Sequence, residues 1–305
     1  MDEYYDEEEI DLLKLVSTNA NDANQFIIFY GSNGQLYAKN VSKIEELVIY
    51  KDIEIVKNNE NNCIIGTGDI RGKLTTIINF DRWMGNTPLA EEAYELIIVA
   101  AYGGHRLGIV VKSVENIISI DSDTMSDNSS ANPKSTFIAK VKLYSKDKMV
   151  TIFDSDMMLS DVFQDIAETS ESSINSLELK VNTNKVFLFA DDSKFIRVML
   201  EKLCHSMHIK YEIYMNGKDL LEAVKKKKAS EIALIISDIE MPIMGGRELI
   251  ENIRLDSEYN DVNIIVHTNM SNDIMQDELM KLGAQKIIGK VNMLSLSETI
   301  EALAK

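Results

Sequence analysis

The chain has 305 residues and carries 49 Asp and Glu against 32 Lys and Arg, a formal net charge of −17. That charge argues against a nucleic-acid-binding protein, because contacts with phosphates need Lys and Arg. The most apolar stretch, residues 96–101, is far too short to span a bilayer and no signal peptide is visible, so we expect a cytoplasmic protein without membrane insertion.

The first 19 residues are predicted to form an acidic leader and a short helix. Six of the first nine residues are acidic, which is typical of a solvated tail rather than a binding motif. Apolar residues then recur in a helical pattern from Ile10 to Val16. A chain of this length has roughly two domains, and the leader precedes the first of them.

Residues 20–165 carry short β-type runs separated by turn signals such as Ser32-Asn33-Gly34. The predicted strands cover residues 25–30, 35–38, 47–50, 74–79, 94–101, 106–111, 137–143 and 149–153. Short, regularly spaced strands predict β-barrels, and Trp83 is expected in their core. The region shows no phosphate loop, no Gly-x-Ser-x-Gly motif and no metal-ligand cluster, so we expect it to offer binding surfaces.

The segment from Gly66 to Gly85 contains an apolar-Arg-Gly turn, a strand and a polar step into a short helix. With supporting matches at residues 41–47 and 107–114, it resembles the central signature of the CheW-like coupling domain. The resemblance implies two intertwined five-stranded β-barrels that bind a histidine kinase's regulatory domain and a chemoreceptor tip. The candidate partner-binding residues are Glu46, Arg71 and Gly72. A turn requirement for Gly72 and a structural salt bridge for Arg71 explain these residues equally well.

Residues 166–184 separate this region from the second predicted domain, residues 185–305. The segment is rich in Ser, Asn and Glu and contains neither Gly nor Pro. Such a composition predicts a partly helical linker rather than a flexible Gly/Ser tether.

The second domain alternates short apolar runs with amphipathic segments. The runs cover residues 186–190, 232–237, 263–267 and 286–289, and their β-branched composition suits strands buried on both faces. Helical patterns cover residues 193–208, 217–228, 246–255, 273–282 and 294–303. This alternation predicts an α/β domain with a parallel sheet covered by helices on both faces.

Polar residues stand at the ends of the four runs: Asp191 and Asp192, Asp238, Thr268, and Lys290. Because the carboxyl ends of parallel strands share one edge of the sheet, these side chains are expected to converge. A cluster of carboxylates favours a hard divalent cation, and Mg²⁺ is the expected ion. Asp238 is the candidate nucleophile for a phosphoryl group, with the Lys290 ammonium and the Thr268 hydroxyl stabilising its oxygens.

The acid pair, the loop Ser-Asp-x-x-Met-Pro-x-Met-x-Gly at residues 237–246, the Thr and the Lys occur in this order, and together they resemble a response-regulator receiver domain. The resemblance covers about residues 184–305 and implies a flavodoxin-like fold with a five-stranded parallel sheet. It implies that Asp238 accepts a phosphoryl group from a histidine kinase, that Thr268 is the switch hydroxyl and that Lys290 binds the phosphate. The implied Mg²⁺ ligands are Asp191, Asp192, Asp238 and the backbone carbonyl of Glu240.

Two positions depart from the receiver pattern. Ile287 stands where the family usually has an aromatic residue, and Val291 replaces the Pro that usually follows the Lys. Neither position is expected to touch the phosphate, so the phosphorylation chemistry should be retained. We expect the readout of phosphorylation to differ from that of a stand-alone receiver.

A CheW-like domain followed by a receiver is similar to the architecture of the CheV coupling proteins. The resemblance implies a non-enzymatic adaptor that links methyl-accepting chemoreceptors to a CheA-type histidine kinase in polar receptor arrays. Phosphorylation of Asp238 would tune the coupling or drain phosphoryl groups from the kinase. The alternative is a phosphatase or phosphotransferase that acts through an aspartate nucleophile.

Three further motifs have simpler structural explanations. The pair Asp154 and Asp156 resembles the Asp-x-Asp motif of haloacid-dehalogenase phosphatases, but an acidic helix start after a strand explains it better. The residues Cys204, His205 and His208 lack a fourth metal ligand nearby. Four lysines at residues 225–228 suit a helix C-terminus. Cys63 and Cys204 are expected to be reduced structural thiols.

Overall fold

The structure is a computed structural model that describes residues 24–58, 63–102, 105–128, 131–163, 168, 172, 174, 181–269, 273–290 and 292–304. The chain divides into two compact units, Met1–Asp154 and Ser155–Lys305. The predicted leader and its helix, and most of the predicted linker, lie outside the described residues. The domain boundaries inferred from sequence stay predictions.

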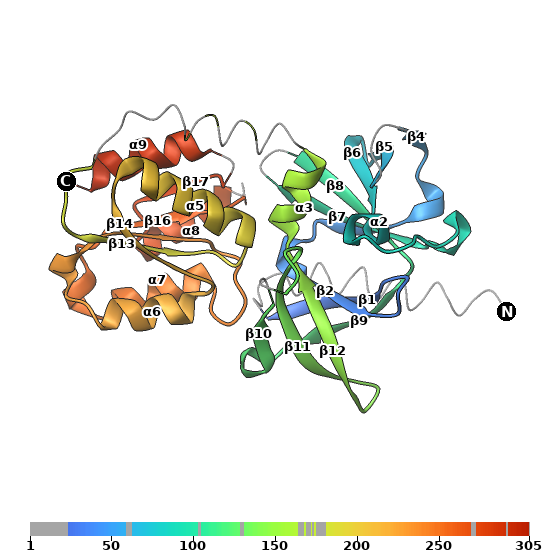
Figure 1. Ribbon diagram of the computed structural model, residues 1–305, viewed down its shortest axis with the longest axis horizontal. Helices are drawn as coiled ribbons and strands as arrows, with labels where there is room; N and C mark the ends of the chain where they lie inside the picture. Colours follow the sequence, from blue (N-terminus) through green and yellow to red (C-terminus); the bar gives the residue numbers. More distant parts are fainter. Residues whose placement is uncertain are drawn as a thin grey trace. The chain divides into compact units, whose positions relative to one another are not determined.

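The described part of the first unit is built from two β-sheets, as predicted (Figure 1). One sheet has the order β10-β11-β12-β2-β1-β9, with strands β1 (Gln25–Tyr30), β2 (Leu36–Asn40), β9 (Val114–Ser119), β10 (Met125–Asp127), β11 (Ser135–Leu143) and β12 (Lys146–Phe153). The other has the order β3-β7-β8-β6-β5-β4, with strands β3 (Glu46–Ile49), β4 (Ile55–Lys57), β5 (Ile64–Ile70), β6 (Lys73–Asn79), β7 (Leu96–Tyr102) and β8 (His105–Val111). Each sheet has one strand more than the five expected, because the three-residue strands β10 and β4 pair at the edges.

The sequence patterns did not predict β4, β5, β9 and β10. In β5 the reason is visible, because Gly66 and Gly68 interrupt the apolar pattern. A Cβ atom on Gly66 would lie 2.1 Å from the Val56 carbonyl oxygen of β4, so glycine is required by the close approach of the neighbouring backbone.

An aromatic cluster fills the core beneath the first sheet. Helix α2 (Phe80–Met84) follows β6, and the Asn79 side chain caps it by accepting a hydrogen bond from the Arg82 amide. The Phe80 ring centroid lies 4.8 Å from those of Phe29 and Tyr37 in edge-on geometry. Trp83 is buried beside Phe80, which confirms the prediction that it belongs to the core.

The second unit contains the predicted five-stranded parallel sheet, in the order β14-β13-β15-β16-β17. Its strands are β13 (Val186–Ala190), β14 (Lys210–Tyr214), β15 (Ile232–Ser237), β16 (Ile264–His267) and β17 (Lys286–Ile288). The apolar runs predicted four of them. The edge strand β14 has no run of its own, because its residues Lys-Tyr-Glu-Ile-Tyr are only half-buried or exposed.

Helices cover both faces of this sheet (Figure 1). Apolar side chains of α5 (Lys194–Met207) and α9 (Met293–Leu303) pack on one face. Those of α6 (Gly217–Lys225), α7 (Gly246–Arg254) and α8 (Asp273–Leu282) pack on the other. The unit begins with α3 (Ser155–Val162), which lies beside α5.

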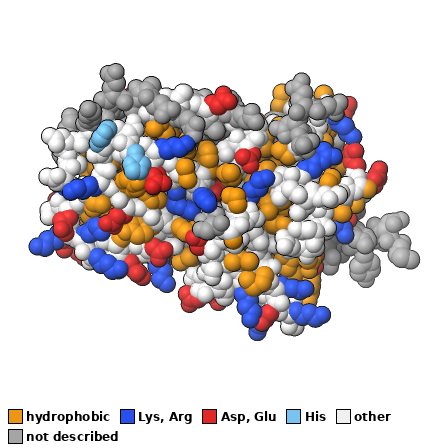
Figure 2. Space-filling model, viewed as in Figure 1, with side chains coloured by type: hydrophobic (Ala, Val, Ile, Leu, Met, Phe, Trp, Pro, Cys, Tyr) orange, Lys and Arg blue, Asp and Glu red, His pale blue; other side chains and the backbone are white. Residues whose placement is uncertain are grey.

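Short 3-10 turns complete the described elements: η1 (Val41–Lys43), η2 (Tyr50–Asp52), η3 (Glu91–Ala93), η4 (Ser122–Thr124), η5 (Ala229–Glu231) and η6 (Ser257–Tyr259). Over the residues searched, no helix has the length and apolar composition needed to cross a membrane. Acidic and basic side chains are interspersed on the described surface that Figure 2 presents.

Candidate functional site

Buried polar side chains lie at the carboxyl ends of four strands of the second unit's sheet. Asp191 follows β13 and Asp238 follows β15, and the two strands pair in parallel up to their last residues. Thr268 follows β16, and Lys290 lies two residues after β17. Each of these four residues is at most 3% exposed. The structure thus brings to one edge the residues that the sequence predicted would converge there.

The Lys290 ammonium is the centre of this group. Its Nζ lies 2.8 Å from Asp238 Oδ2, 3.0 Å from Asp191 Oδ2 and 3.1 Å from Asp156 Oδ2. Burial alone would lower the pKa of Lys290, but the carboxylates of Asp156, Asp191 and Asp238 outweigh it and raise the pKa well above its usual value. The lysine is therefore a permanent cation at neutral pH.

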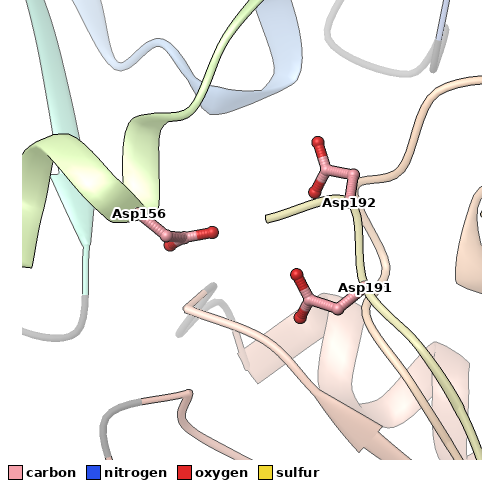
Figure 3. A group of neighbouring side chains, drawn as sticks. All are labelled: Asp156, Asp191 and Asp192. Atoms are coloured by element: carbon pink, nitrogen blue, oxygen red, sulfur yellow. The ribbon is translucent and has the colours of Figure 1, made fainter. Parts of the chain in front are cut away.

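One ammonium does not balance the acidic side chains around it. Burial raises the pKa of Asp191 well above its usual value; the Lys290 charge opposes this shift, and Asp238 and Asp156 add to it. Carboxylate oxygens of Asp156, Asp191 and Asp192 lie within 4.8 Å of one another (Figure 3). This set of hard oxygen donors fits a divalent cation such as Mg²⁺, which would offset the excess negative charge.

The loop after Asp238 fixes the direction of its carboxylate. The Ile239 amide donates to Asp238 Oδ1 at 2.7 Å, while Oδ2 faces Lys290. A Cβ atom on Gly246 would lie 2.1 Å from the Asp238 carbonyl oxygen, so only glycine allows the loop to return this close. Glu240 is buried within the loop, and the role of its backbone carbonyl as a metal ligand stays a prediction.

Asp156 was not predicted to belong to this site. It lies in the first turn of α3, as the expected acidic helix start, and is 4% exposed. Its Oδ1 accepts a hydrogen bond from Asn269 Nδ2 at 2.8 Å and its Oδ2 accepts one from Lys290. The Asp-x-Asp pattern after a strand was the one sequence signal that pointed to this residue.

His267 is a second buried group that sequence reasoning missed. It ends β16 and is 1% exposed. Burial, and then the Lys290 charge, lower its pKa to about 4, so the imidazole is neutral at physiological pH. A histidine inside an otherwise apolar run was the signal available in the sequence.

One of the two departures from the receiver pattern can be located. The Ile287 side chain is half-buried and packs against the core on the α6, α7 and α8 face. An aliphatic side chain thus fills the position where an aromatic ring was expected. Val291 lies outside the described residues.

The candidate partner-binding residues of the first unit also lie together. Arg71 and Gly72 form a two-residue turn between β5 and β6, with φ values of 54° and 77° that suit a type I′ hairpin. The exposed Arg71 Nε lies 2.8 Å from Glu46 Oε2. The Arg106 side chain, which is 8% exposed and was not predicted, contacts Glu46 at 2.5 Å and Glu45 at 2.8 Å.

The cysteine and histidine residues of α5 have structural positions. Cys204 is fully buried, and burial raises its pKa. His208 ends the helix with φ 57°, and its amide donates to the Cys204 and His205 carbonyls. The only group of metal-ligating side chains found among the residues searched is that of Asp156, Asp191 and Asp192.

Comparisons with known proteins divide the chain in the same order. Residues 26–163 match the CheW-like domain family, and residues 187–301 match the response regulator receiver domain family. Chemotaxis protein CheV2 of Helicobacter pylori (strain ATCC 700392 / 26695) is 25% identical over 308 residues, covering 95% of this chain and 98% of that protein. Chemotaxis protein CheV1 of the same strain is 26% identical over 310 residues, covering 94% and 95%.

Solved structures are similar to single parts of the chain. The crystal structure of the scaffolding protein TtCheW from Thermoanaerobacter tengcongensis is 23% identical and covers 43% of this chain and 84% of that one, with a TM-score of 0.37.

Proposed function

We propose that this chain, a CheV-type protein with a CheW-like domain before a receiver domain, is an adaptor coupling chemoreceptors to a CheA-type histidine kinase. The receiver accepts a phosphoryl group on Asp238, which tunes the coupling or drains phosphoryl groups from the kinase. The observation that carries this proposal is the contact of Asp238 Oδ2 with the buried Lys290 ammonium at 2.8 Å. The adaptor acts in the cytoplasm, at receptor arrays.

Phosphoryl transfer needs a positioned nucleophile and a way to neutralise charge. An Asp238 carboxylate oxygen attacks phosphorus in line, the bond from phosphorus to the kinase's histidine nitrogen breaks, and the leaving imidazole takes up a proton. The Lys290 ammonium binds the phosphoryl oxygens, and the Thr268 hydroxyl donates to one of them. Asp191, Asp192, Asp238 and the Glu240 carbonyl would hold Mg²⁺, which supplies further charge neutralisation.

The hairpin of the first unit is the proposed partner surface. Arg71 is exposed on the turn and contacts Glu46 Oε2, while the largely buried Arg106 side chain contacts Oε1 of the same carboxylate. Arg106 is a positioning residue in this proposal, because it fixes the carboxylate that Arg71 contacts. Gly72 is needed for the turn, since its φ of 77° is unfavourable for other residues.

Transfer of labelled phosphate from a phosphorylated CheA-type kinase, with Mg²⁺ present, tests the acceptor role. Wild type is expected to gain hydroxylamine-labile label, and Asp238→Asn is expected to gain none. Asp277→Asn on the exposed side of α8 is the charge-matched control and should behave as wild type. Equal label in wild type and Asp238→Asn would refute the assignment of Asp238.

The adaptor and the enzyme alternative differ in a simple assay. An adaptor co-sediments with receptor-kinase assemblies and does not turn over a small phosphoester. Turnover that is lost in Asp154→Asn would favour the phosphatase instead.

A further inference from the structure

The Asp156 carboxylate lies inside the acceptor site and both of its oxygens are bound there. Asn269 Nδ2 donates to Oδ1 at 2.8 Å and Lys290 Nζ donates to Oδ2 at 3.1 Å. Asn269 directly follows Thr268, and Lys290 is the cation that also contacts Asp238. The donors that hold Asp156 are thus at the place where a phosphoryl group on Asp238 would need donors.

A carboxylate and a phosphoryl group compete for such donors. Both are anions that accept charge-assisted hydrogen bonds. Asp238 Oδ2 and Asp156 Oδ2 contact the same Lys290 nitrogen, so a phosphoryl group on Asp238 would extend into the space of the Asp156 carboxylate. Two anions in that space repel each other, and a buried carboxylate that loses its cation is strongly unfavourable.

Packing of α3 explains why Asp156 stays in the site in the absence of a phosphoryl group. Met158, Leu159 and Val162 on the same helix are at most 7% exposed, and α3 lies beside α5. The helix start is therefore held by apolar contacts as well as by the charge of Lys290.

We propose that Asp156 is a built-in occupant of the phosphoryl pocket, which a phosphoryl group on Asp238 displaces. The inference rests on the proposed acceptor role of Asp238, and it names Asp156 as the side chain that phosphorylation would displace. The start of α3 immediately follows Asp154, the last residue of the first unit. Displacement of Asp156 would release the segment that leaves the CheW-like domain and so connect phosphorylation to the coupling part of the chain.

The contacts of the Asp156 carboxylate fit the role of an occupant of the pocket. Each of its oxygens accepts a hydrogen bond from a nitrogen donor, as the oxygens of a phosphoryl group would. Its distance from Asp191 and Asp192, within 4.8 Å between oxygens, makes a metal role the competing explanation that an experiment must separate.

The first test is calorimetric titration of the full chain with beryllofluoride, a phosphoryl analogue, in saturating Mg²⁺. Asp156→Asn is expected to bind beryllofluoride about tenfold more tightly than wild type. The reason is that the charge-assisted hydrogen bond from Lys290 to the Asp156 carboxylate no longer competes with the ligand. Asp161→Asn changes the same charge on α3 at a half-buried position and should match wild type. Equal or weaker binding by Asp156→Asn would overturn the proposal, and weaker Mg²⁺ binding alongside it would assign Asp156 to the metal.

The second test needs no substitution at residue 156. Amide hydrogen exchange of residues 155–162 in wild type is expected to become at least about fivefold faster when beryllofluoride and Mg²⁺ bind, because α3 loses an anchor. Asp238→Asn should show no such change. Unchanged exchange in wild type with beryllofluoride bound would overturn the displacement. Failure of every variant to bind beryllofluoride would overturn the acceptor role itself, and this inference with it.

Discussion

The two units use charged side chains in opposite ways. In the second unit, Lys290 and its three carboxylate partners are at most 4% exposed, and each contact is made in the interior. In the first unit, the Arg71 side chain is 77% exposed and contacts Glu46 on a hairpin. A buried charge is strongly destabilising unless an opposite charge lies beside it. An exposed ion pair is screened by solvent and contributes little to stability. We therefore expect substitutions in the buried cluster of the second unit to lower stability, and substitution of Arg71 on the hairpin to affect recognition.

Replacing Lys290 should give the largest effect on stability. Lys290→Met leaves buried carboxylates without their cation, which should lower the free energy of unfolding of the second unit by about 4 kcal/mol. Lys281→Met, at an exposed position of α8, should change it by less than about 0.5 kcal/mol. Urea unfolding followed by circular dichroism measures both. Equal effects of the two substitutions would mean that the buried cluster is not a stability determinant.

The neutral His267 should make stability depend on pH. Its pKa is near 6.5 when unfolded and about 4 when folded, so the unfolded chain binds the proton more tightly. The neutral imidazole makes its full contribution to the free energy of unfolding above pH 6.5. This contribution is lost as the pH falls through 4, and the loss reaches about 3 kcal/mol. The difference in unfolding free energy between wild type and His267→Asn, measured from pH 7 to 4, should follow this curve. A difference independent of pH would contradict the buried neutral imidazole.

Mg²⁺ should stabilise the second unit and leave the first unchanged. At a free concentration 100 times its Kd, a ligand that binds only the folded state adds about 2.7 kcal/mol. Thermal unfolding with and without Mg²⁺ should show this gain in wild type and lose most of it in Asp191→Asn. A shift of the same size in Asp191→Asn would place the ion elsewhere.

Substitutions of Arg106 and Arg71 in the first unit should have the smallest effects on stability, and the two effects should differ. Arg106→Ala breaks a mostly buried pair of contacts and should cost about 2 kcal/mol, whereas Arg71→Ala should cost less than about 0.5 kcal/mol. Arg71→Ala should nevertheless weaken co-sedimentation with receptor-kinase assemblies, if the hairpin is the partner surface. Normal co-sedimentation of Arg71→Ala would leave its salt bridge as a structural feature only.

The convergence of the candidate site could be predicted because each of these residues is marked by its local sequence. Asp191, Asp238, Thr268 and Lys290 each stand directly at or near the end of an apolar run, and parallel strands bring those ends together. Asp156 and Asn269 could not be paired this way. They are 113 residues apart, and only the packing of α3 brings them into contact.

The fold shows the same division between buried and partly exposed elements. The central strands of the parallel sheet are apolar on both faces, so their runs identified them. Strand β14 lies at the edge, where half-buried Tyr and Glu side chains remove the pattern. Arg106 was missed because its burial depends on Glu45 and Glu46, and no motif records a partner that lies 60 residues away.

The contacts of Lys290 also bear on how the second unit folds. Its partners precede it by 134, 99 and 52 residues, so each contact closes a long loop of chain. Closing a long loop costs chain entropy before the contact that it allows has formed. This order slows folding. Until β17 pairs with β16, the acidic side chains repel one another without their cation. We expect the pairing of β17 with β16 to be the step that brings the ammonium to these carboxylates.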